Sequence, residues 1–344
     1  MSNSSLQPTT SEIVDFWQRY DCDRIHPLDT FGQATVYKAL DQENQTQVAA
    51  KIAEIHPAFD NNAAYGQRYL RATTLAHKNC IKYEAVYRSQ IENTVHYGLV
   101  MPLLNQGSLL NTRPHSDWSL MQQHDFLLQT ADALQYLHKA GIVVQNLHAS
   151  HLLLQPTADG YAPMLINYAQ VERLPLAFIQ NFEYLAPEQF DADYQPTLQT
   201  DVWAFGVLAY WLFTGHKPFG KKAPQMPNRL IQQRILEDET PQLVERIPSP
   251  YSELIGQCLQ KDLAARPKDL SEIVATLASL APEKSTAIYV APEANLIAQD
   301  DEDNPVPLWQ RRFSRRPSRP INPLLVLLLI GLAVLVGTLL NRIS

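Results

Sequence analysis

The segment that organises this chain is Gly141-Ile-Val-Val-Gln-Asn-Leu-His-Ala-Ser-His-Leu-Leu-Leu154. Apolar residues at helical spacing precede it and predict a helix over residues 119–140. The basic residues His138 and Lys139, followed by Gly141, are typical of a helix C-terminus. The three leucines that close the segment predict a short strand. The sequence therefore predicts a helix, a loop and a strand in that order.

Other motifs follow on both sides of this loop, always in the same order along the chain. They are Gln47-Val-Ala-Ala-Lys-Ile52, Leu165-Ile-Asn-Tyr-Ala169, Ala186-Pro-Glu188, Asp201-Val-Trp-Ala-Phe-Gly206, Thr214-Gly-His-Lys-Pro-Phe219 and Cys258-Leu-Gln-Lys-Asp-Leu-Ala-Ala-Arg-Pro267. Several motifs in one order are far more specific than any of them alone. Together they resemble the motifs of the protein kinase family, particularly its bacterial Ser/Thr branch, over residues 21–282.

The resemblance implies an α+β fold with two lobes, a small β-rich N-terminal lobe and a large helical C-terminal lobe. Glu188, Asp201 and Arg266 match architectural positions of the family's large lobe. The resemblance implies that Arg266 pairs with Glu188 and that Asp201 opens a buried central helix. A chain of 344 residues with 45% hydrophobic content suits one such domain with a tail.

The positions that carry catalysis in the family hold different residues here. Asn146 stands in place of the Asp that accepts the substrate hydroxyl proton, and Asn167 in place of the Asp that holds the principal magnesium ion. His151 stands in place of the Asn that holds a second magnesium ion. An amide cannot act as a base, and Mg²⁺ prefers carboxylate or phosphate oxygen. We therefore predict a pseudokinase in which no catalytic position is intact.

Two histidines of this loop could be imagined as metal ligands. His148 and His151 lie three residues apart, but no Cys or carboxylate lies near them in sequence, so we predict no metal site. We interpret them as substitutions of the Lys and the Asn that the family has at these positions.

The residues that face ATP phosphates in the family are also altered. Lys51 matches the lysine that contacts the α- and β-phosphates, but Arg68 stands where the family has its partner Glu, and a second cation is expected to repel Lys51. The three glycine positions of the phosphate-covering turn hold Asp29, Phe31 and Ala34. A side chain at these positions hinders the close approach of backbone to phosphate, so a plain hairpin turn is expected.

A nucleotide pocket could persist around the hinge between the lobes. Residues 99–104 resemble that hinge, with Met101 at the gatekeeper position and Leu103 beside it, although Pro102 removes one backbone donor. Together with Lys51, these residues leave ATP binding without magnesium open. No other cofactor is predicted.

Residues 167–188 correspond to the activation segment and contain no Ser or Thr. The family's phosphate-reading Arg is Gln145 here, so the switch and its sensor are both missing. The sequence therefore excludes switching by Ser/Thr phosphorylation in this segment.

The charge distribution disfavours a nucleic-acid partner. The net charge is −7, and the six arginines after residue 310 leave −13 on residues 1–310. The three cysteines, Cys22, Cys80 and Cys258, are odd in number and far apart, which indicates a reducing compartment and buried thiols.

The C-terminal region predicts attachment to a membrane. Residues 321–340 carry no charge and span about 30 Å as a helix, which matches a bilayer core, while a buried globular helix is the alternative. Five arginines precede this span and no signal peptide is apparent, so we expect a single-pass protein of a bacterial inner membrane with a cytoplasmic domain. The expected divisions are an N-terminal tail (1–20), a kinase-like domain (21–282), a linker with a basic juxtamembrane segment (283–320), a transmembrane helix (321–340) and a short tail (341–344).

These observations predict a membrane-tethered, catalytically inactive module that binds, scaffolds or regulates a protein partner of unknown identity. An atypical active ATP-dependent Ser/Thr kinase is the alternative, and a nucleotide sensor that works without metal is a third.

Overall fold

The computed structural model describes residues 12–31, 34–55, 62–91, 94–169, 179, 181–220, 226–239 and 247–280. The chain divides into two compact units, Met1–Ile297 and Ala298–Ser344, and every described residue belongs to the first. The predicted transmembrane helix over residues 321–340 and the basic segment before it lie outside the described residues. Within the described ranges, no helix combines the length and the hydropathy that a membrane span requires.

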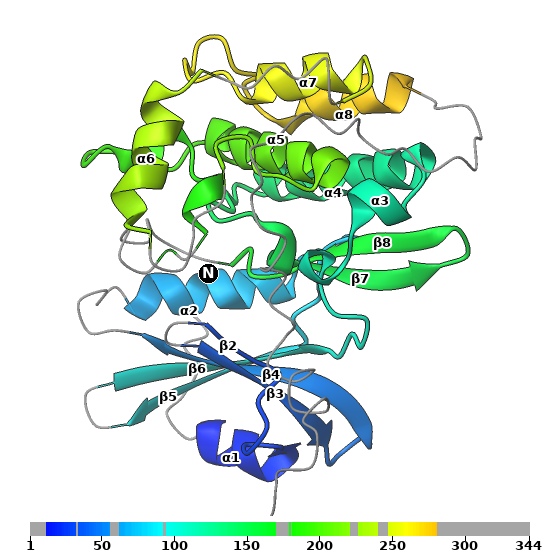
Figure 1. Cartoon of the computed structure of the whole chain (residues 1–344). Coiled ribbons are helices and arrows are strands. Elements are labelled where there is room, and N and C mark those ends of the chain that lie inside the picture. Colours follow the sequence, from blue (N-terminus) through cyan, green and yellow to red (C-terminus); the bar gives the residue numbers. More distant parts are fainter. Residues whose placement is uncertain are drawn as a thin grey trace, which may run out of the picture. The chain divides into compact units, whose positions relative to one another are not determined.

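An antiparallel sheet forms the N-terminal lobe (Figure 1). Its strands follow the order β1-β3-β4-β6-β5, and β2 also pairs with β3. Lys51 lies on β4, between Val36 of β3 and Leu99 of β6, so it belongs to an interior strand and not to an edge. The strands are β1 (Tyr20–Cys22), β2 (Asp29–Phe31), β3 (Ala34–Asp41), β4 (Thr46–Ile55), β5 (Ala85–Ile91) and β6 (Thr94–Pro102).

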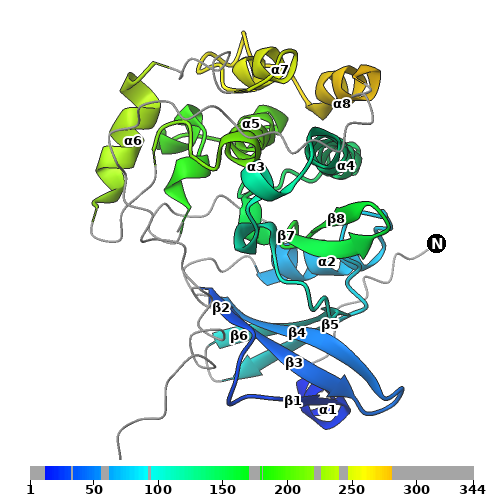
Figure 2. The same ribbon diagram turned by 45° about the vertical axis from the view of Figure 1, so that its right-hand side comes forward.

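Two helices cover opposite faces of this sheet, α1 (Glu12–Arg19) and α2 (Asn62–Thr73), as Figures 1 and 2 both show. Successive residues of a strand face opposite sides. Val48 and Ala50 accordingly join the small core that contains Phe16 of α1, whereas Ala49 joins the main core. Part of the segment expected to be an N-terminal tail therefore forms a helix that packs on the sheet.

The C-terminal lobe is built from helices and one two-stranded hairpin. Its elements are η2 (Leu109–Asn111), α3 (Pro114–Asp117), α4 (Leu120–Lys139), η3 (Ala149–His151), β7 (Leu152–Thr157), β8 (Gly160–Leu165), η5 (Phe182–Tyr184), η6 (Pro187–Phe190), α5 (Leu198–Thr214), α6 (Asn228–Glu237), α7 (Tyr251–Cys258) and α8 (Leu270–Ser279). The three C-terminal leucines of the organising segment thus lie in strand β7, as predicted.

Helix α5 is the buried centre of this lobe. It is apolar on all sides, which is the pattern of a helix enclosed by neighbours, and every residue from Thr200 to Thr214 is buried. A Cβ atom at Gly206 would lie 2.6 Å from the Cβ of Cys258, so only glycine allows α7 to approach this closely. The central helix implied by the resemblance is therefore present.

Helix α4 has the boundaries that its sequence signals predict. The Ser119 hydroxyl accepts a hydrogen bond from the Gln122 backbone (3.3 Å), and the Gln122 side chain accepts one from the Ser119 backbone (2.9 Å). At the other end, Gly141 adopts a φ of +70°, which suits glycine.

One strand begins later than expected. The sequence predicts a strand pair over Lys82–Ser89 and Thr94–Met101, and the structure forms it, but β5 begins only at Ala85. The residues before it turn toward the other lobe, where the backbone N–H of Ile81 donates to the carbonyl of Leu165 (2.9 Å). Ile81 thus bonds to the C-terminal lobe, and the chain returns to the sheet at Glu84, whose backbone N–H donates to the carbonyl of Val100 in β6 (2.8 Å).

Candidate functional site

A buried carboxylate shapes the loop after α4. Asp201 is fully buried at the start of α5 and accepts hydrogen bonds from the backbone N–H groups of Val144 and Gln145, both at 2.7 Å. Its second oxygen also lies 2.9 Å from Nε2 of His138. A buried carboxylate is stable only when its oxygens are satisfied in this way. The backbone of the loop is therefore fixed by Asp201, independently of the side chains that the loop presents.

Two residues of the site hold left-handed backbone conformations. Gln145 has a φ of +64° and Asn167 has a φ of +59°. Such conformations cost about 1–3 kcal/mol for most residues and persist where the surrounding structure enforces them. Asn adopts this region more readily than other side chains, so Asn167 fits its position better than Gln145 does.

A pair of buried, neutral imidazoles follows the loop. The Nδ1 atom of His151 lies 2.8 Å from the carbonyl oxygen of Asn146, and the ring of His148 lies 3.6 Å from that of His151, centroid to centroid. Burial, together with the charge of Lys51, lowers the pKa of His151 to about 3. Burial also lowers the pKa of His148 well below its ordinary value. Both rings are therefore uncharged at neutral pH.

The surroundings of the two imidazoles hold few groups that bind metals. Among the residues that the structure describes, no three His, Cys, Asp or Glu side chains gather closely enough to hold a metal ion. The side-chain oxygen of Asn146 is buried and accepts no hydrogen bond from the described residues. Asn146 thus places a neutral hydrogen-bond acceptor at the position where a catalytic base would need a carboxylate.

Lys51 and Asn167 meet directly across the two lobes. The Nζ atom of Lys51 donates to Oδ1 of Asn167 at 2.7 Å. Tyr83, which is buried, holds Asn167 from the other side by accepting its backbone N–H at 3.1 Å. Burial lowers the pKa of Lys51 to about 8. The oxygen that would face a magnesium ion in the family therefore accepts a hydrogen bond from an ammonium group.

Arg68 reaches from helix α2 to the loop after α4. Its Nη2 atom donates to the carbonyl oxygen of Val143 at 2.9 Å. One turn further along α2, Arg71 donates to the carbonyl of Ala140, which ends α4. Free carbonyls at a helix C-terminus attract cations, so Arg71 suits the Ala140 carbonyl, whereas the partner of Arg68 lies in the loop beyond α4. This geometry explains how a cation is accommodated where repulsion from Lys51 was expected.

The hinge and the phosphate-side turn are partly described. Met101 is buried in β6, Pro102 is the last residue of that strand, and Leu103 packs half-buried against the main core. Asp29 pairs with Val36 and accepts the N–H of Thr30 at 2.8 Å. Residues 32–33 and the side chain of Phe31 lie outside the described parts of the chain.

Glu188 and Arg266 form a buried ion pair away from the cleft. Two nitrogens of Arg266 lie 2.7 and 3.1 Å from the two oxygens of Glu188, which is a bidentate geometry. The side chain of Arg266 is fully buried and that of Glu188 is 14% exposed. The guanidinium also lies 5.1 Å from the ring centroid of Trp203 and donates to the backbone of Gln199.

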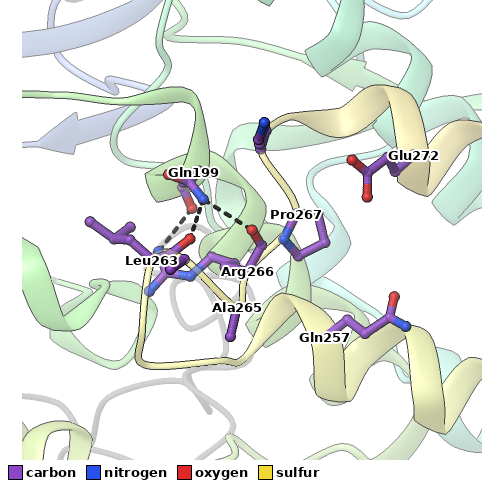
Figure 3. Close-up of a pocket in the computed structure, with 9 residues that line it drawn as sticks. Gln199, Gln257, Leu263, Ala265, Arg266, Pro267 and Glu272 are labelled. Atoms are coloured by element: carbon purple, nitrogen blue, oxygen red, sulfur yellow. Dashed lines mark hydrogen bonds between the residues drawn. The ribbon is translucent and has the colours of Figure 1, made fainter.

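Arg266 also lines an open pocket of about 580 Å³ (Figure 3). The Gln199 side chain donates to the carbonyls of Leu263 and Arg266 at 2.6 and 3.0 Å, as the dashed lines in Figure 3 show. The side chain of Gln199 thus holds the loop between α7 and α8. The pocket is best explained as part of this structural junction.

The end of the segment that corresponds to an activation loop is held by aromatic packing. The buried Tyr184 accepts a hydrogen bond from Lys217, whose Nζ atom also lies 3.7 Å from the Tyr184 ring centroid. The charge of Lys217 contributes to lowering the pKa of His148. These contacts leave the Tyr184 hydroxyl inaccessible in this conformation.

Some participants were not predicted from the sequence. Tyr83 gives no pattern that would mark it, because a single tyrosine in a loop has no periodicity. Arg71 could have been found, since it lies three residues after Arg68 and so shares a face of the same helix. Of the predicted site residues, Lys51 and Asn167 contact each other and Arg68 contacts the loop at Val143, whereas Glu188 and Arg266 serve a separate junction.

The fold and the site together define a protein with the two-lobed architecture of a protein kinase and an altered set of cleft residues. Residues 30–279 match the protein kinase domain family, so the chain belongs to that family. The match begins after α1 and β1, which extend the N-terminal lobe.

Its relatives include bacterial Ser/Thr kinases. The Serine/threonine-protein kinase PknL of Mycobacterium tuberculosis is 27% identical over 287 residues, which cover 78% of this chain and 67% of PknL. The Serine/threonine-protein kinase PknA of the same species is 28% identical over 262 residues, covering 72% of this chain and 58% of PknA. Serine/threonine-protein kinases drp72 of Corynebacterium efficiens is 25% identical, covering 72% of this chain and 48% of the relative.

Proposed function

We propose that this protein has a kinase fold without phosphoryl transfer and acts as a binding, scaffolding or regulatory module. The observation that carries the proposal is the 2.7 Å contact between Lys51 Nζ and Asn167 Oδ1. A metal-binding carboxylate at position 167 would supply the charge that holds Mg²⁺, whereas the neutral amide supplies none and is already occupied by an ammonium group. The principal metal position of the family is therefore filled by a competing interaction.

Other losses point the same way. Phosphoryl transfer depends on positioned metal ions, a base or orienting residue, and a lysine held by its partner carboxylate. Asn146 and His151 supply neither a carboxylate base nor a charged metal ligand, and Arg68 binds the Val143 carbonyl. Because catalysis in this family is mostly electrostatic positioning, losing these parts together removes most of the rate enhancement.

An atypical active Ser/Thr kinase is the second candidate. The names of the relatives and the retention of Lys51 on a central strand favour it. A nucleotide sensor that binds without metal is a third candidate. It requires fewer intact residues in the cleft than an active kinase does, because it needs no base.

Residues outside the described part supply the cellular context of the proposal. We infer that residues 321–340 tether the domain to a bacterial inner membrane and that the domain faces the cytoplasm, since five arginines precede the uncharged span. The partner would be a protein, and the negative charge on residues 1–310 argues against nucleic acid.

Single-turnover assays on the purified full chain test this function. With radiolabelled ATP and either Mg²⁺ or Mn²⁺, we expect no label on the chain itself or on generic protein substrates. A Lys51→Ala variant prepared in parallel distinguishes intrinsic activity from a contaminating kinase. Metal-dependent labelling that this substitution abolishes would establish the second candidate instead.

A further inference from the structure

The turn at Asn167 and Tyr168, which follows strand β8, is attached to the segment before strand β5. The hydroxyl of Tyr168 donates to the carbonyl oxygen of Ile81 at 2.5 Å. The backbone N–H of Asn167 donates to the hydroxyl oxygen of Tyr83 at 3.1 Å. Two tyrosine hydroxyls, one from each of the two segments, therefore connect the turn to residues 81–83.

Backbone hydrogen bonds make the same connection at the end of strand β8. The N–H of Leu165 donates to the carbonyl of Asn79 at 2.8 Å, and the carbonyl of Leu165 accepts the N–H of Ile81 at 2.9 Å. Cys80, between these two partners, forms a parallel bridge with Leu165. These backbone bonds fix the end of β8, and the two tyrosine hydroxyls extend the connection to the turn beyond it.

Both tyrosines are buried and uncharged. Their rings lie 5.3 Å apart, centroid to centroid, and Ile81 between them in the chain contact is buried as well. Burial raises the pKa of both hydroxyls, so each keeps its proton at neutral pH and stays a neutral hydrogen-bonding group. A buried carbonyl that loses its donor is costly, so displacing Tyr168 would leave the Ile81 oxygen unsatisfied.

Asn167 is held in a backbone conformation that needs outside support. Its φ is +59°, in the left-handed region. Residues other than glycine occupy this region sparsely and remain there where the surrounding structure enforces it. Lys51 of strand β4 bonds to the Asn167 side chain at 2.7 Å, and Tyr83 bonds to its backbone. The turn is therefore restrained from two different segments.

We propose that the turn at Asn167 and Tyr168 is locked in one conformation by the hydroxyl groups of Tyr83 and Tyr168, without any ligand in the cleft. The lock fixes the residues at which the segment corresponding to an activation loop begins. A protein partner would meet a preset surface here, and its binding would not have to order the turn. The inference concerns the mobility of the turn and holds whether or not the cleft transfers phosphate.

Hydrogen exchange measured by mass spectrometry on the full chain tests this lock. We expect the amides of residues 164–169 to exchange slowly in the absence of ligand. Tyr168→Phe and Tyr83→Phe each remove one hydroxyl and keep the ring, and each should accelerate this exchange about tenfold, because one buried group loses its partner. Tyr251→Phe is the matched control, since its buried hydroxyl bonds to His124 at 2.9 Å within the C-terminal lobe. It should leave exchange of residues 164–169 unchanged.

Two native thiols separate local opening from unfolding of the whole domain. Cys80 is buried next to Ile81, which accepts the Tyr168 bond, and Cys258 is buried in helix α7. Alkylation by iodoacetamide, measured for each cysteine, should accelerate at Cys80 in the two tyrosine variants relative to Cys258. The ratio of the two rates reports on the lock even where a variant is less stable as a whole.

Three outcomes overturn the inference. They are wild-type exchange of residues 164–169 as fast as that of the exposed turn 42–45, variants that match the wild type in both measurements, and an equal acceleration in Tyr251→Phe. A mobile turn in a chain without phosphoryl transfer rejects this inference and leaves the proposed function standing. Phosphoryl transfer by a chain whose turn is protected rejects the proposed function and leaves the lock standing.

Discussion

Arg68 of helix α2 donates to the carbonyl oxygen of Val143 in the loop of the other lobe, at 2.9 Å. In an active kinase, the residue at this position pairs with the lysine of the N-terminal sheet, and movement of the helix controls that pair. Here Lys51 binds Asn167, and the helix is attached to the C-terminal lobe through Arg68 and Arg71. A movable connection within one lobe has been replaced by fixed connections between the two lobes.

Replacing Arg68 should loosen helix α2. We expect Arg68→Ala to lower the free energy of unfolding by about 1.5–3 kcal/mol, because a hydrogen bond from a charged donor is lost and the Val143 carbonyl loses its partner. Hydrogen exchange measured by mass spectrometry should rise in residues 62–73. Arg229→Ala, on the exposed face of α6, is the control and should leave exchange in α2 unchanged. Unaltered exchange in the Arg68 variant would show that the contact does not restrain the helix.

The pair Glu188–Arg266 should be essential for stability. Removing either partner leaves the other buried and uncompensated, so Glu188→Ala and Arg266→Ala should each destabilise by about 3–5 kcal/mol in urea unfolding. Glu43→Ala is the control, because its partner Arg19 and Glu43 itself are substantially exposed, and a loss below about 1 kcal/mol is expected. If both buried variants unfolded at the wild-type urea concentration, the pair would contribute nothing to stability.

The buried imidazoles should make the protein less stable in acid. Burial lowers the folded-state pKa of His151 from its ordinary value of 6.5 to about 3, so the unfolded chain binds the proton first as the pH falls. Stability should therefore be fully present above pH 6.5 and decrease below it, by at most about 1.4 kcal/mol per pH unit for this residue. His148, whose pKa is also lowered, should add to the effect.

Urea unfolding at a series of pH values from about 7.5 to about 5 measures this dependence, because the series spans the ordinary histidine pKa. His151→Gln should flatten the profile below pH 6.5, and His26→Gln, which changes an exposed imidazole, should not. A wild-type profile as flat as that of the His151 variant would contradict the prediction.

Membrane attachment should depend on the C-terminal region alone. We expect protease added outside spheroplasts to leave the kinase-like domain intact, because positive charge beside a span is retained on the cytoplasmic face. A chain truncated after Pro305 should appear in the soluble fraction. Digestion from outside would reverse the proposed topology, and a truncated chain that still sediments with membranes would show that earlier residues also bind them.

Much of the large lobe follows from its sequence, because its signals are local. The capping box at Ser119, the glycine at residue 141 and the apolar helix from Leu198 to Thr214 each specify an element through nearby residues. The late start of β5 could not be predicted in the same way. It depends on the pairing of Ile81 with Leu165, residues far apart in the chain, and no periodic pattern records such a pairing.

In the cleft, too, some features can be predicted from the sequence and others cannot. Substitutions at Asn146, Asn167 and Arg68 are visible in the sequence once the motifs fix the register. The new partners that these residues take are not visible, because Lys51 and Asn167 are separated by more than a hundred residues and Arg68 could have reached several acceptors. Sequence therefore predicts which interactions of the family are lost, and structure is needed to find those that replace them.

The carboxylate of Asp201 holds the loop through the backbone of Val144 and Gln145 and not through any side chain that the loop presents. Mutations at the presented positions can therefore accumulate without unfolding the protein, and they can also be reversed. The loop can therefore present different side chains on the same backbone. A change of the side chains at this loop therefore needs no change in the carboxylate that holds its backbone.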